Sequence, residues 1–465
     1  MSGAKSSESG KSRGQGGGAR EGRGGDAGGG GSVPGLPGLP ELPGLPELPK
    51  RTGPLAGVVV LDLSRALAGP YATLMLGDAG AQVIKVERPG TGDDSRGWGP
   101  PFAGPPEASQ STYFLSVNRN KLSVELDFWS DEGRVALDEL LRRADVVVEN
   151  FRPEVRKRLG LTERELARLN SRLVALSITG FGEDGPDGHR PGYDQILQGE
   201  GGLMSLTGQP DGPPTKVGVP IADILSGMFG AFGVVAALRE RERTGKGQVV
   251  HTSLLAAVIA VHAYQGTRWL IAGEVPGREG DRHPTITPYG AYACSDASIN
   301  ISVGSDKLWQ QLAPVVGLDP DEPRFATNEL RRANRVELDG IIERAFASEA
   351  AGVWMARLDE AGIPAGLVKT LDQVYQSPQV EHLGLIDNIE HPTLGTIRLP
   401  GSPLTYSDSP PSPSLAPPLL GQHNALVMRW LGLGGAEAGT AGDLGGGQAT
   451  VPAPAEVARS DEPAG

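Results

Sequence analysis

The segment from Gly57 to Gly90 constrains the fold more than any other part of the chain, and it reads GVVVLDLSRALAGPYATLMLGDAGAQVIKVERPG. An apolar run rich in valine is followed by a helical stretch and then by a second β-branched run. Two short buried strands joined by a helix form the βαβ unit of a parallel sheet. We therefore predict an α/β fold whose sheet begins in this segment.

The first turn of this unit has no phosphate-binding loop. A dinucleotide-binding unit carries G-x-G-x-x-G here, whereas Ser64 to Pro70 reads SRALAGP, with one glycine and a proline. Glu87 ends the second predicted strand, where such a unit keeps its ribose-binding acid, so a nicotinamide site is an alternative. The missing glycines argue against that alternative.

Strands and helices continue to alternate beyond the first unit. Residues 135–143 and 163–169 have helical patterns, and the runs ADVVVENF and LVALSITGFG have strand patterns. This alternation predicts a doubly wound parallel sheet over residues 54–283. After Asp223 the chain forms a predicted buried helix with Gly227, Gly230 and Gly233 every third position, which indicates close packing. The next stretch, 251–273, reads as one further apolar helix.

The remaining chain divides by composition. Residues 284–369 alternate strand and helix patterns in a way that predicts a smaller α+β domain. The proline-rich residues 370–433 are too irregular for a third core, so we expect them to return to the large domain. Residues 1–53 are rich in Gly, Arg and Pro, and residues 434–465 in Gly, Ala and Pro; both are predicted to be disordered.

Charge and composition exclude several classes of protein. Asp and Glu number 56 against 43 Lys and Arg, for a net charge of −13, which argues against nucleic acid or anionic membrane as a partner. The chain lacks an uninterrupted apolar run of about 18 residues and a signal-peptide pattern. A single cysteine, Cys294, permits neither an intrachain disulfide nor a cysteine metal site. These features predict a cytoplasmic protein without a bound metal.

No conventional catalytic motif is present, so the candidates for chemistry are acidic. Asp223 and Asp194 each stand just before or at the start of an apolar helical stretch. The commonest role of such an aspartate is to cap the helix N-terminus. The alternative role is that of a nucleophile whose pKa the helix dipole holds near or below about 3.9. An ionised carboxylate could attack an acyl thioester and form a mixed anhydride. His189 and His251 read as a loop residue and a strand-end residue.

Several segments, in order, resemble the class III CoA-transferases (CaiB/BaiF type), the family of formyl-CoA transferase and carnitine CoA-transferase. They span roughly Pro54 to His423 and include LDLSRALAGPYATLMLGDAGAQVIKVERPGTGDD, YFLSVNRNKLSVELD, ADVVVENFRPEVRKRLGL, GVPIADILSG and PPLLGQH. The resemblance implies an enzyme that moves coenzyme A from an acyl-CoA to a free carboxylic acid, with no permanently bound cofactor. It also implies a homodimer of interlocked rings.

The resemblance also assigns roles to residues. The nucleophile of the transferases falls on Asp223, which would carry the acyl group as an anhydride and then CoA as a thioester. The family's CoA contacts fall on Leu67, Ala68, Arg88, Leu126, Asn150, Phe151, Arg152, Arg158, Tyr193 and Asp194. Arginines among them suit the phosphates of the nucleotide.

Departures from the family pattern narrow the range of expected substrates. Leu67 replaces a glutamine of formyl-CoA transferase, and Trp129 and Pro191 replace lysines that help hold CoA there. The run of four glycines in that enzyme's small domain is missing as well, which argues against formyl and oxalyl substrates. The amino-acid sequence of several segments is more similar to the succinate-hydroxymethylglutarate CoA-transferase branch, so a dicarboxylate such as succinate is the expected substrate.

Two other functions remain open at this point. An α-methylacyl-CoA racemase of the same fold uses a histidine and carboxylates to exchange the α-proton. Those enzymes resemble G-H-D where this chain has Gly192, Tyr193 and Asp194, and the tyrosine weakens that alternative. A non-catalytic CoA-binding protein, with the Gly/Arg-rich arm as its working part, is the second alternative.

Overall fold

The computed structural model describes residues 47–433. Most of the predicted N-terminal arm and the whole predicted C-terminal tail lie outside this range, so those two predictions concern residues beyond the described part of the chain.

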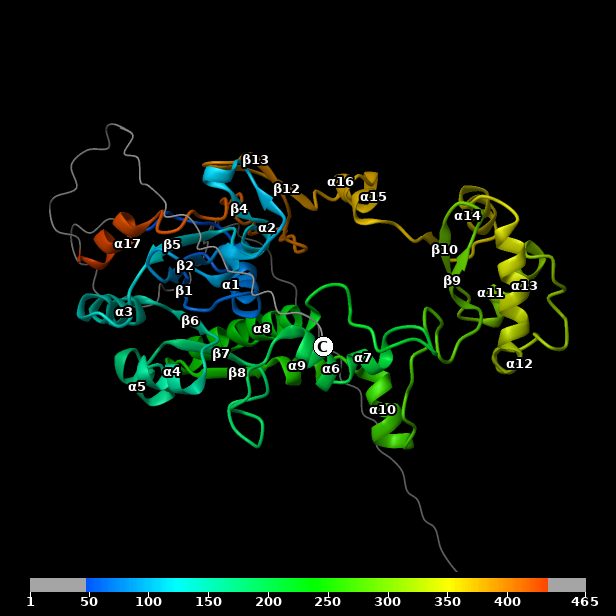
Figure 1. The fold of residues 1–465 in the computed structure, drawn as a ribbon, viewed down its shortest axis with the longest axis horizontal. Helices are drawn as coiled ribbons and strands as arrows, with labels where there is room; N and C mark the ends of the chain where they lie inside the picture. The colour runs from blue at the N-terminus through cyan, green and yellow to red at the C-terminus, as the bar shows by residue number, and fades with distance from the viewer. Residues whose placement is uncertain (1–46, 434–465) are drawn as a thin grey trace, which may run out of the picture. The chain divides into compact units, whose positions relative to one another are not determined.

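A six-stranded parallel sheet forms the centre of the structure, in the order β5-β2-β1-β6-β7-β8 (Figure 1). Its strands are β1 (Val59–Asp62), β2 (Gln82–Glu87), β5 (Lys121–Glu125), β6 (Val146–Glu149), β7 (Val174–Thr179) and β8 (Val249–Ser253). Leu61 of β1 pairs with Ile84 of β2 on one side and with Val147 of β6 on the other. The predicted α/β sheet is confirmed.

Helices cover both faces of this sheet. On one face, α1 (Ala68–Asp78), α8 (Ile221–Thr244) and α9 (Leu254–Ala260) share a core with side chains such as Val60 and Leu176. On the other face, α3 (Asp131–Arg143), α5 (Glu163–Leu169) and α17 (Asn424–Leu431) share a second core with Leu61 and Val147. Successive residues of a strand point to opposite faces, so a strand buried on both sides is apolar throughout. The fold is therefore doubly wound, as predicted.

Helix α8 lies closer to α1 and to the sheet than it could if residues 227, 230 and 233 had side chains. A Cβ added to Gly227 would lie 2.7 Å from the Ala68 carbonyl oxygen of α1. A Cβ at Gly230 would meet Leu176 of β7 at 2.8 Å, and one at Gly233 would meet Val250 of β8 at 2.7 Å. The three-residue spacing of glycines thus fits the helix against both α1 and the sheet.

By length and mean hydropathy alone, α8 is also apolar enough to cross a membrane, the one such helix within residues 47–433. The sequence of α8 is not an uninterrupted apolar run, because glycines and Asp223 interrupt it. Core helices of globular folds have the same composition, so a single helix of this kind is weak evidence for a span. Its glycine face is buried against α1, β7 and β8, which accounts for its composition without a membrane.

The prediction of a single apolar helix over residues 251–273 is wrong. The segment begins within β8, which pairs in parallel with β7, and continues as α9 and α10 (Ala263–Ala272). Two β-branched residues, Val250 and Thr252, flank His251 in the strand. Ala263 adopts a φ of +46°, which breaks the helical path between α9 and α10.

Residues 289–367 build a separate core. A three-stranded antiparallel sheet in the order β11-β10-β9 packs with helices around Trp309, Phe346 and Trp354. The elements are β9 (Tyr289–Ala293), β10 (Ser298–Ser302), α11 (Asp306–Val315), α12 (Asn328–Ala333), α13 (Arg335–Ala347), α14 (Ala351–Glu360) and β11 (Ala365–Leu367). This α+β arrangement follows the strand and helix patterns of the sequence.

The segment after residue 370 is more regular than its sequence indicated. It forms α15 (Leu371–Tyr375), α16 (Pro378–His382) and the antiparallel hairpin β12 (Ile386–His391) and β13 (Gly395–Pro400). Ile389 and Leu399 of the hairpin form a small apolar cluster with Leu115. Near the end, the His423 N–H donates to the Ser123 carbonyl of β5 over 2.9 Å.

Short elements complete the large domain and carry several residues of the site. They are η1 (Asp94–Gly97), β3 (Phe102–Ala103), η2 (Pro106–Ala108), β4 (Gln110–Ser111), α2 (Thr112–Val117), α4 (Pro153–Arg158), α6 (Asp194–Glu200) and α7 (Leu203–Leu206).

Candidate active site

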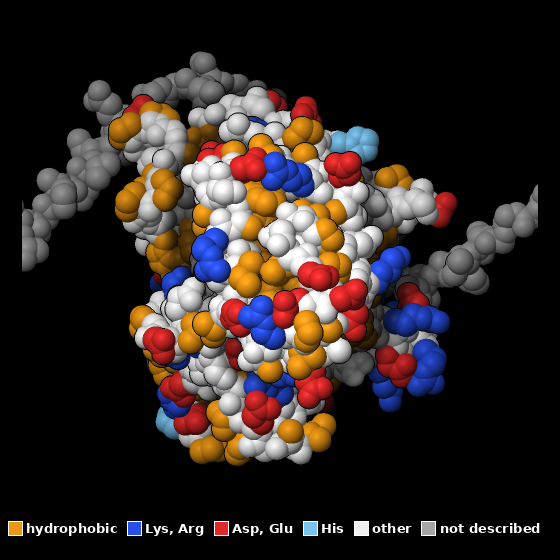
Figure 2. Space-filling view, turned by 90° about the vertical axis from the view of Figure 1, so that its right-hand side faces the viewer, with side chains coloured by type: hydrophobic (Ala, Val, Ile, Leu, Met, Phe, Trp, Pro, Cys, Tyr) orange, Lys and Arg blue, Asp and Glu red, His pale blue; other side chains and the backbone are white. Residues whose placement is uncertain are grey.

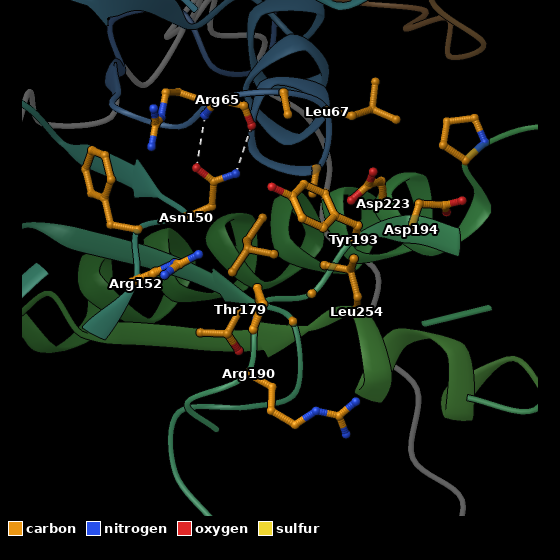
Figure 3. A pocket seen from close by; sticks show the side chains of 18 of the residues that line it. Arg65, Leu67, Asn150, Arg152, Thr179, Arg190, Tyr193, Asp194, Asp223 and Leu254 are labelled. Carbon is orange, nitrogen blue, oxygen red and sulfur yellow. Dashed lines mark hydrogen bonds between the residues drawn. The ribbon is translucent and has the colours of Figure 1, made fainter. Parts of the chain in front are cut away.

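A cavity of about 540 Å³ lies at the carboxyl ends of β1, β6 and β7, beside the first turns of α1, α6 and α8. Ligands of open α/β sheets bind at this end of the strands. Side chains and backbone of these strand-to-helix turns line the cavity (Figure 3). Tyr113 of α2 lines it as well. Of the residues that the sequence proposed for the site, the lining includes Leu67, Ala68, Asn150, Phe151, Arg152, Tyr193, Asp194 and Asp223.

The turn between β1 and α1 is tied to the turn after β6. The Arg65 N–H donates to Asn150 Oδ1 over 3.0 Å, and Asn150 Nδ2 donates to the Arg65 carbonyl over 2.8 Å (Figure 3). This pair of bonds uses both ends of the amide side chain. Asn150 therefore holds the backbone that carries Leu67 and Ala68 into the cavity.

Asp194 caps α8, although it belongs to α6. Its Oδ1 accepts the N–H of Ala222, the second residue of α8, over 2.8 Å. Its Oδ2 accepts from Gln198 Nε2, also over 2.8 Å. The residue before α8 is Pro220, which has no capping side chain. Asp194 therefore caps the neighbouring helix α8 and not α6, the helix in which it lies.

Asp223 lies in the first turn of α8 and accepts no hydrogen bond from the residues that the structure describes. It does not cap the helix, because Asp194 already satisfies the nearby backbone. In Figure 3 the carboxylates of Asp223 and Asp194 lie beside each other, next to Tyr193. Of these two carboxylates, Asp194 is fixed by hydrogen bonds and Asp223 accepts none from the described residues.

The expected low pKa of Asp223 is wrong. Burial, and after it the negative charge of Asp194, raises its pKa from an ordinary 3.8 to about 7. Removing a carboxylate from water disfavours its charged form, and a like charge adds to this effect. The helix dipole favours the anion by only about 1 kcal/mol, which is too little to offset the burial.

Three of the proposed CoA contacts lie outside the cavity lining. Arg88 forms an ion pair with Asp94, which itself lines the cavity. Arg158 lies over the ring of Trp129, with 4.3 Å between the guanidinium carbon and the ring centroid. Leu126 is 4% exposed and belongs to the core between the sheet and α3. Only Arg88 therefore reaches the rim of the cavity through a partner.

Other cavity residues carry no motif and were missed from the sequence. Tyr113 lies edge-on to Trp98, with 4.9 Å between the ring centroids. Burial, together with the charges of Asp223 and Asp194, raises the pKa of Tyr113 to about 12, so its phenol keeps its proton and can donate a hydrogen bond. Arg65, Arg190 and His189 also line the cavity. A helical position such as Tyr113 gives no signal in sequence, because only the fold brings it to the site.

The cationic side chains of the cavity differ in their partners. Arg65 pairs with Asp94 at 3.2 Å, and Arg190 pairs with Glu200 and Asp187. Arg152 has no ion pair or hydrogen bond with the described residues through its side chain. Its guanidinium, which offers five N–H donors, is therefore available to an anionic ligand.

Residues 55–424 match the model of CoA-transferase family III, and the chain belongs to this family. Succinyl-CoA:glutarate CoA-transferase from Mus musculus is 40% identical over 378 residues, which cover 81% of this chain and 86% of the relative. Succinate–glutarate CoA-transferase from Agrobacterium fabrum is 39% identical over 384 residues, covering 81% of this chain and 96% of the relative.

Solved structures agree with this assignment. A CAIB/BAIF family protein from Brucella suis has a TM-score of 0.75 and is 37% identical, covering 82% of this chain and all of that structure. The chain is therefore a transferase, and CoA thioesters are its substrates.

The raised pKa of Asp223 predicts how activity depends on pH. A carboxylate nucleophile must be ionised, so kcat/KM should increase with pH and level off above about 7, the pKa of Asp223. Asp194→Asn keeps an oxygen that can accept the Ala222 N–H but removes the like charge. We expect the midpoint of this profile to move down by roughly one pH unit in that variant. Initial rates from pH 5 to 9 measure both midpoints.

Stability provides an independent check of the same pKa. Because the folded pKa of Asp223 lies above its unfolded value, ionisation of Asp223 lowers the stability of the fold as pH rises from about 4 to 7. Asp223→Asn removes this cost, so the variant should gain more in Tm over wild type at pH 8 than at pH 5. A rate profile that is flat from pH 5 to 8, or an equal gain in Tm at both pH values, would contradict the assignment.

Proposed function

We propose that the chain transfers coenzyme A between dicarboxylic acids, with succinyl-CoA as donor and a glutarate-like acid as acceptor, and that Asp223 carries the intermediates. The observation that supports this proposal most is a half-buried carboxylate, free of hydrogen bonds from the described residues, in a cavity of a CoA-transferase family III chain. The names of the mouse and Agrobacterium relatives support the choice of acids.

The first half of the reaction loads CoA onto the protein. An Asp223 oxygen attacks the carbonyl carbon of the acyl thioester, the C–S bond breaks, and CoA leaves as a thiolate while a mixed anhydride forms. The thiolate then attacks Cγ of Asp223, and the donor acid leaves as a carboxylate. The product of this half is an aspartyl-CoA thioester, so the energy of the thioester bond is kept.

The second half reverses these steps with another acid. The acceptor carboxylate attacks Cγ of Asp223, and CoA leaves again as a thiolate while a second anhydride forms. The thiolate attacks the acyl carbon of the acceptor, and Asp223 returns as a carboxylate. Each step needs a nucleophile and a leaving group but no general base, which agrees with a carboxylate as the nucleophile.

The environment of Asp223 favours the covalent states. Acylation removes its negative charge from a partly desolvated position beside Asp194, so the repulsion that raises its pKa is relieved. The neutral phenol of Tyr113 and the backbone at Leu67 and Ala68 lie in the same cavity and can donate to the oxyanion that forms at the attacked carbon.

The guanidinium groups account for recognition of the anions. The side chain of Arg152 has no ion pair or hydrogen bond with residues 47–433, and Arg65 lies on the same side of the cavity, beside Asn150 (Figure 3). Phosphates of CoA and the second carboxylate of a dicarboxylic acid both suit an arginine fork. We infer that Arg152 and Arg88 contact CoA, together with Leu67, Ala68, Asn150, Phe151, Tyr193, Asp194, Leu126 and Arg158.

We further propose that two copies form a homodimer. Helices α8 and α10 expose large apolar side chains: Phe232 is 74% exposed, Leu270 80% and Ile271 83%. Figure 2 shows hydrophobic side chains at the surface of one face, between charged ones. Large apolar side chains that are exposed in a single chain are typical of an interface between subunits.

One transfer assay tests both the preferred acceptor acid and the role of Asp223 as nucleophile. With succinyl-CoA and a panel of free acids, kcat/KM should be at least roughly tenfold higher for dicarboxylates such as glutarate than for acetate, because only they use a second arginine contact. Asp223→Asn should lower transfer by at least about 1000-fold, since no covalent intermediate can form. Liquid chromatography of the acyl-CoA products measures both effects.

An exposed aspartate provides the control for this test. Asp211, in the loop before α8, is exposed, so Asp211→Asn should transfer CoA like wild type. Transfer by Asp223→Asn at more than a tenth of the wild-type rate would refute the proposal. Exchange of the α-proton of an acyl-CoA in deuterated water, without transfer of CoA to another acid, would instead favour the racemase alternative.

The dimer is tested by its mass and its permanence. Sedimentation equilibrium should give twice the 48.5 kDa mass of the chain at micromolar concentration. If the subunits interlock, a mixture of tagged and untagged protein should form no mixed dimers until denaturant unfolds it. A monomer, or mixed dimers that form on simple dilution, would contradict the proposed assembly.

A further inference from the structure

The turn that carries Leu67 and Ala68 into the cavity is compact and strained. Ala66 has a φ of +67°, in the left-handed region that residues with a Cβ rarely adopt. The turn folds back so tightly that a Cβ on Gly69 would lie 2.2 Å from the Cβ of Ser64. Such a conformation persists only when neighbouring groups hold it in place.

Asp93, in the loop after β2, holds this turn at its strained residue. Its Oδ1 accepts the N–H of Ala66 over 3.1 Å, and it also accepts the N–H and hydroxyl of Ser95 over 2.9 and 2.8 Å. The side chain is 2% exposed. A short buried acceptor thus fixes the backbone N–H of the residue that adopts the left-handed conformation.

A buried lysine, Lys85, holds the Asp93 side chain in place. Lys85 of β2 is fully buried, and its Nζ lies 2.8 Å from Asp93 Oδ2 and donates to the Ser64 carbonyl over 3.0 Å. Burial of the two charges is offset by their attraction: this ion pair lowers the pKa of Asp93 and raises the pKa of Lys85. Asp93 therefore stays ionised and stays in place.

The opposite side of the turn lies against the helix of the nucleophile. Gly227, one turn after Asp223, packs directly on the Ala68 carbonyl, as the 2.7 Å approach of an added Cβ shows. The turn is thus held between Asp93 on one side and α8 on the other. A shift of the turn changes the position of Leu67 and Ala68 relative to the Asp223 carboxylate.

We propose that Asp93 is a positioning residue for the transfer reaction. Asp93 fixes Ala66 in its left-handed conformation, and this conformation places the Leu67–Ala68 backbone against the acyl group that Asp223 attacks. This inference rests on the proposed function of Asp223. Asp93 does not line the cavity itself and touches no substrate, so its effect on catalysis acts through the turn.

The test compares two variants that differ in one hydrogen-bond acceptor. Asp93→Asn and Asp93→Leu are each combined with Lys85→Met, so that neither leaves an unpaired buried charge and both can fold. The asparagine oxygen can accept the Ala66 N–H, and leucine cannot. We expect kcat within about tenfold of wild type for the asparagine variant and a further loss of roughly 100-fold for the leucine variant. KM for succinyl-CoA should change less than kcat in both.

A third substitution tests whether strain at Ala66 is the reason. Glycine adopts a positive φ without cost, so Ala66→Gly should restore roughly tenfold of the kcat that the leucine variant loses. Asp78→Asn is the matched control: Asp78 is a partly buried aspartate paired with Arg119 at the other end of α1, and its replacement should lower Tm without lowering kcat of the folded enzyme.

Three results would overturn the proposal. They are equal kcat values for the asparagine and leucine variants, no recovery of kcat on adding Ala66→Gly, and a loss of kcat in Asp78→Asn as large as that in the leucine variant. Failure of the proposed function gives a different result, because Asp223→Asn would then keep its transfer activity whatever the Asp93 variants do.

Discussion

The close approach of α8 to α1 and to the sheet determines where the candidate nucleophile lies. Gly227, Gly230 and Gly233 remove the side chains that would otherwise separate α8 from Ala68, Leu176 and Val250. The first turn of α8, which contains Asp223, is thereby brought to the carboxyl ends of β1 and β7, where the cavity opens. The glycines lower helix propensity by about 1 kcal/mol each, and packing of the helix against α1 and against the sheet offsets this cost.

Burial of charge is the second constraint on the site. The structure treats its carboxylates in opposite ways: Asp93 is paired with Lys85 and Asp194 is bound by the Ala222 N–H, whereas Asp223 has no bonding partner among the described residues. The fixed carboxylates shape the backbone around the cavity. The free one has a raised pKa and loses its charge when it is acylated, so the same desolvation that destabilises the ionised residue favours the covalent intermediate.

The sequence predicted the parallel sheet well because its strands are short, apolar and separated by helical patterns, as in residues 57–90. It did not predict β8, because residues 251–253 of this strand were assigned to the apolar helix that follows them. Nor did it predict the pKa of Asp223, because burial and the distance to Asp194 depend on packing. Tyr113 and Arg65 reach the cavity only through the fold, whereas most residues carried over from the family resemblance do line it.

The role of Asp223 as the carrier of coenzyme A is tested most directly by trapping the intermediate. The full chain is incubated with succinyl-CoA, quenched at mildly acidic pH and digested with trypsin, and peptide 217–239 is analysed by mass spectrometry. This peptide should gain the mass of CoA less one water through a thioester at Asp223, and adding glutarate before the quench should remove the adduct. An active enzyme that forms no such adduct, or forms it on another residue, would contradict the account.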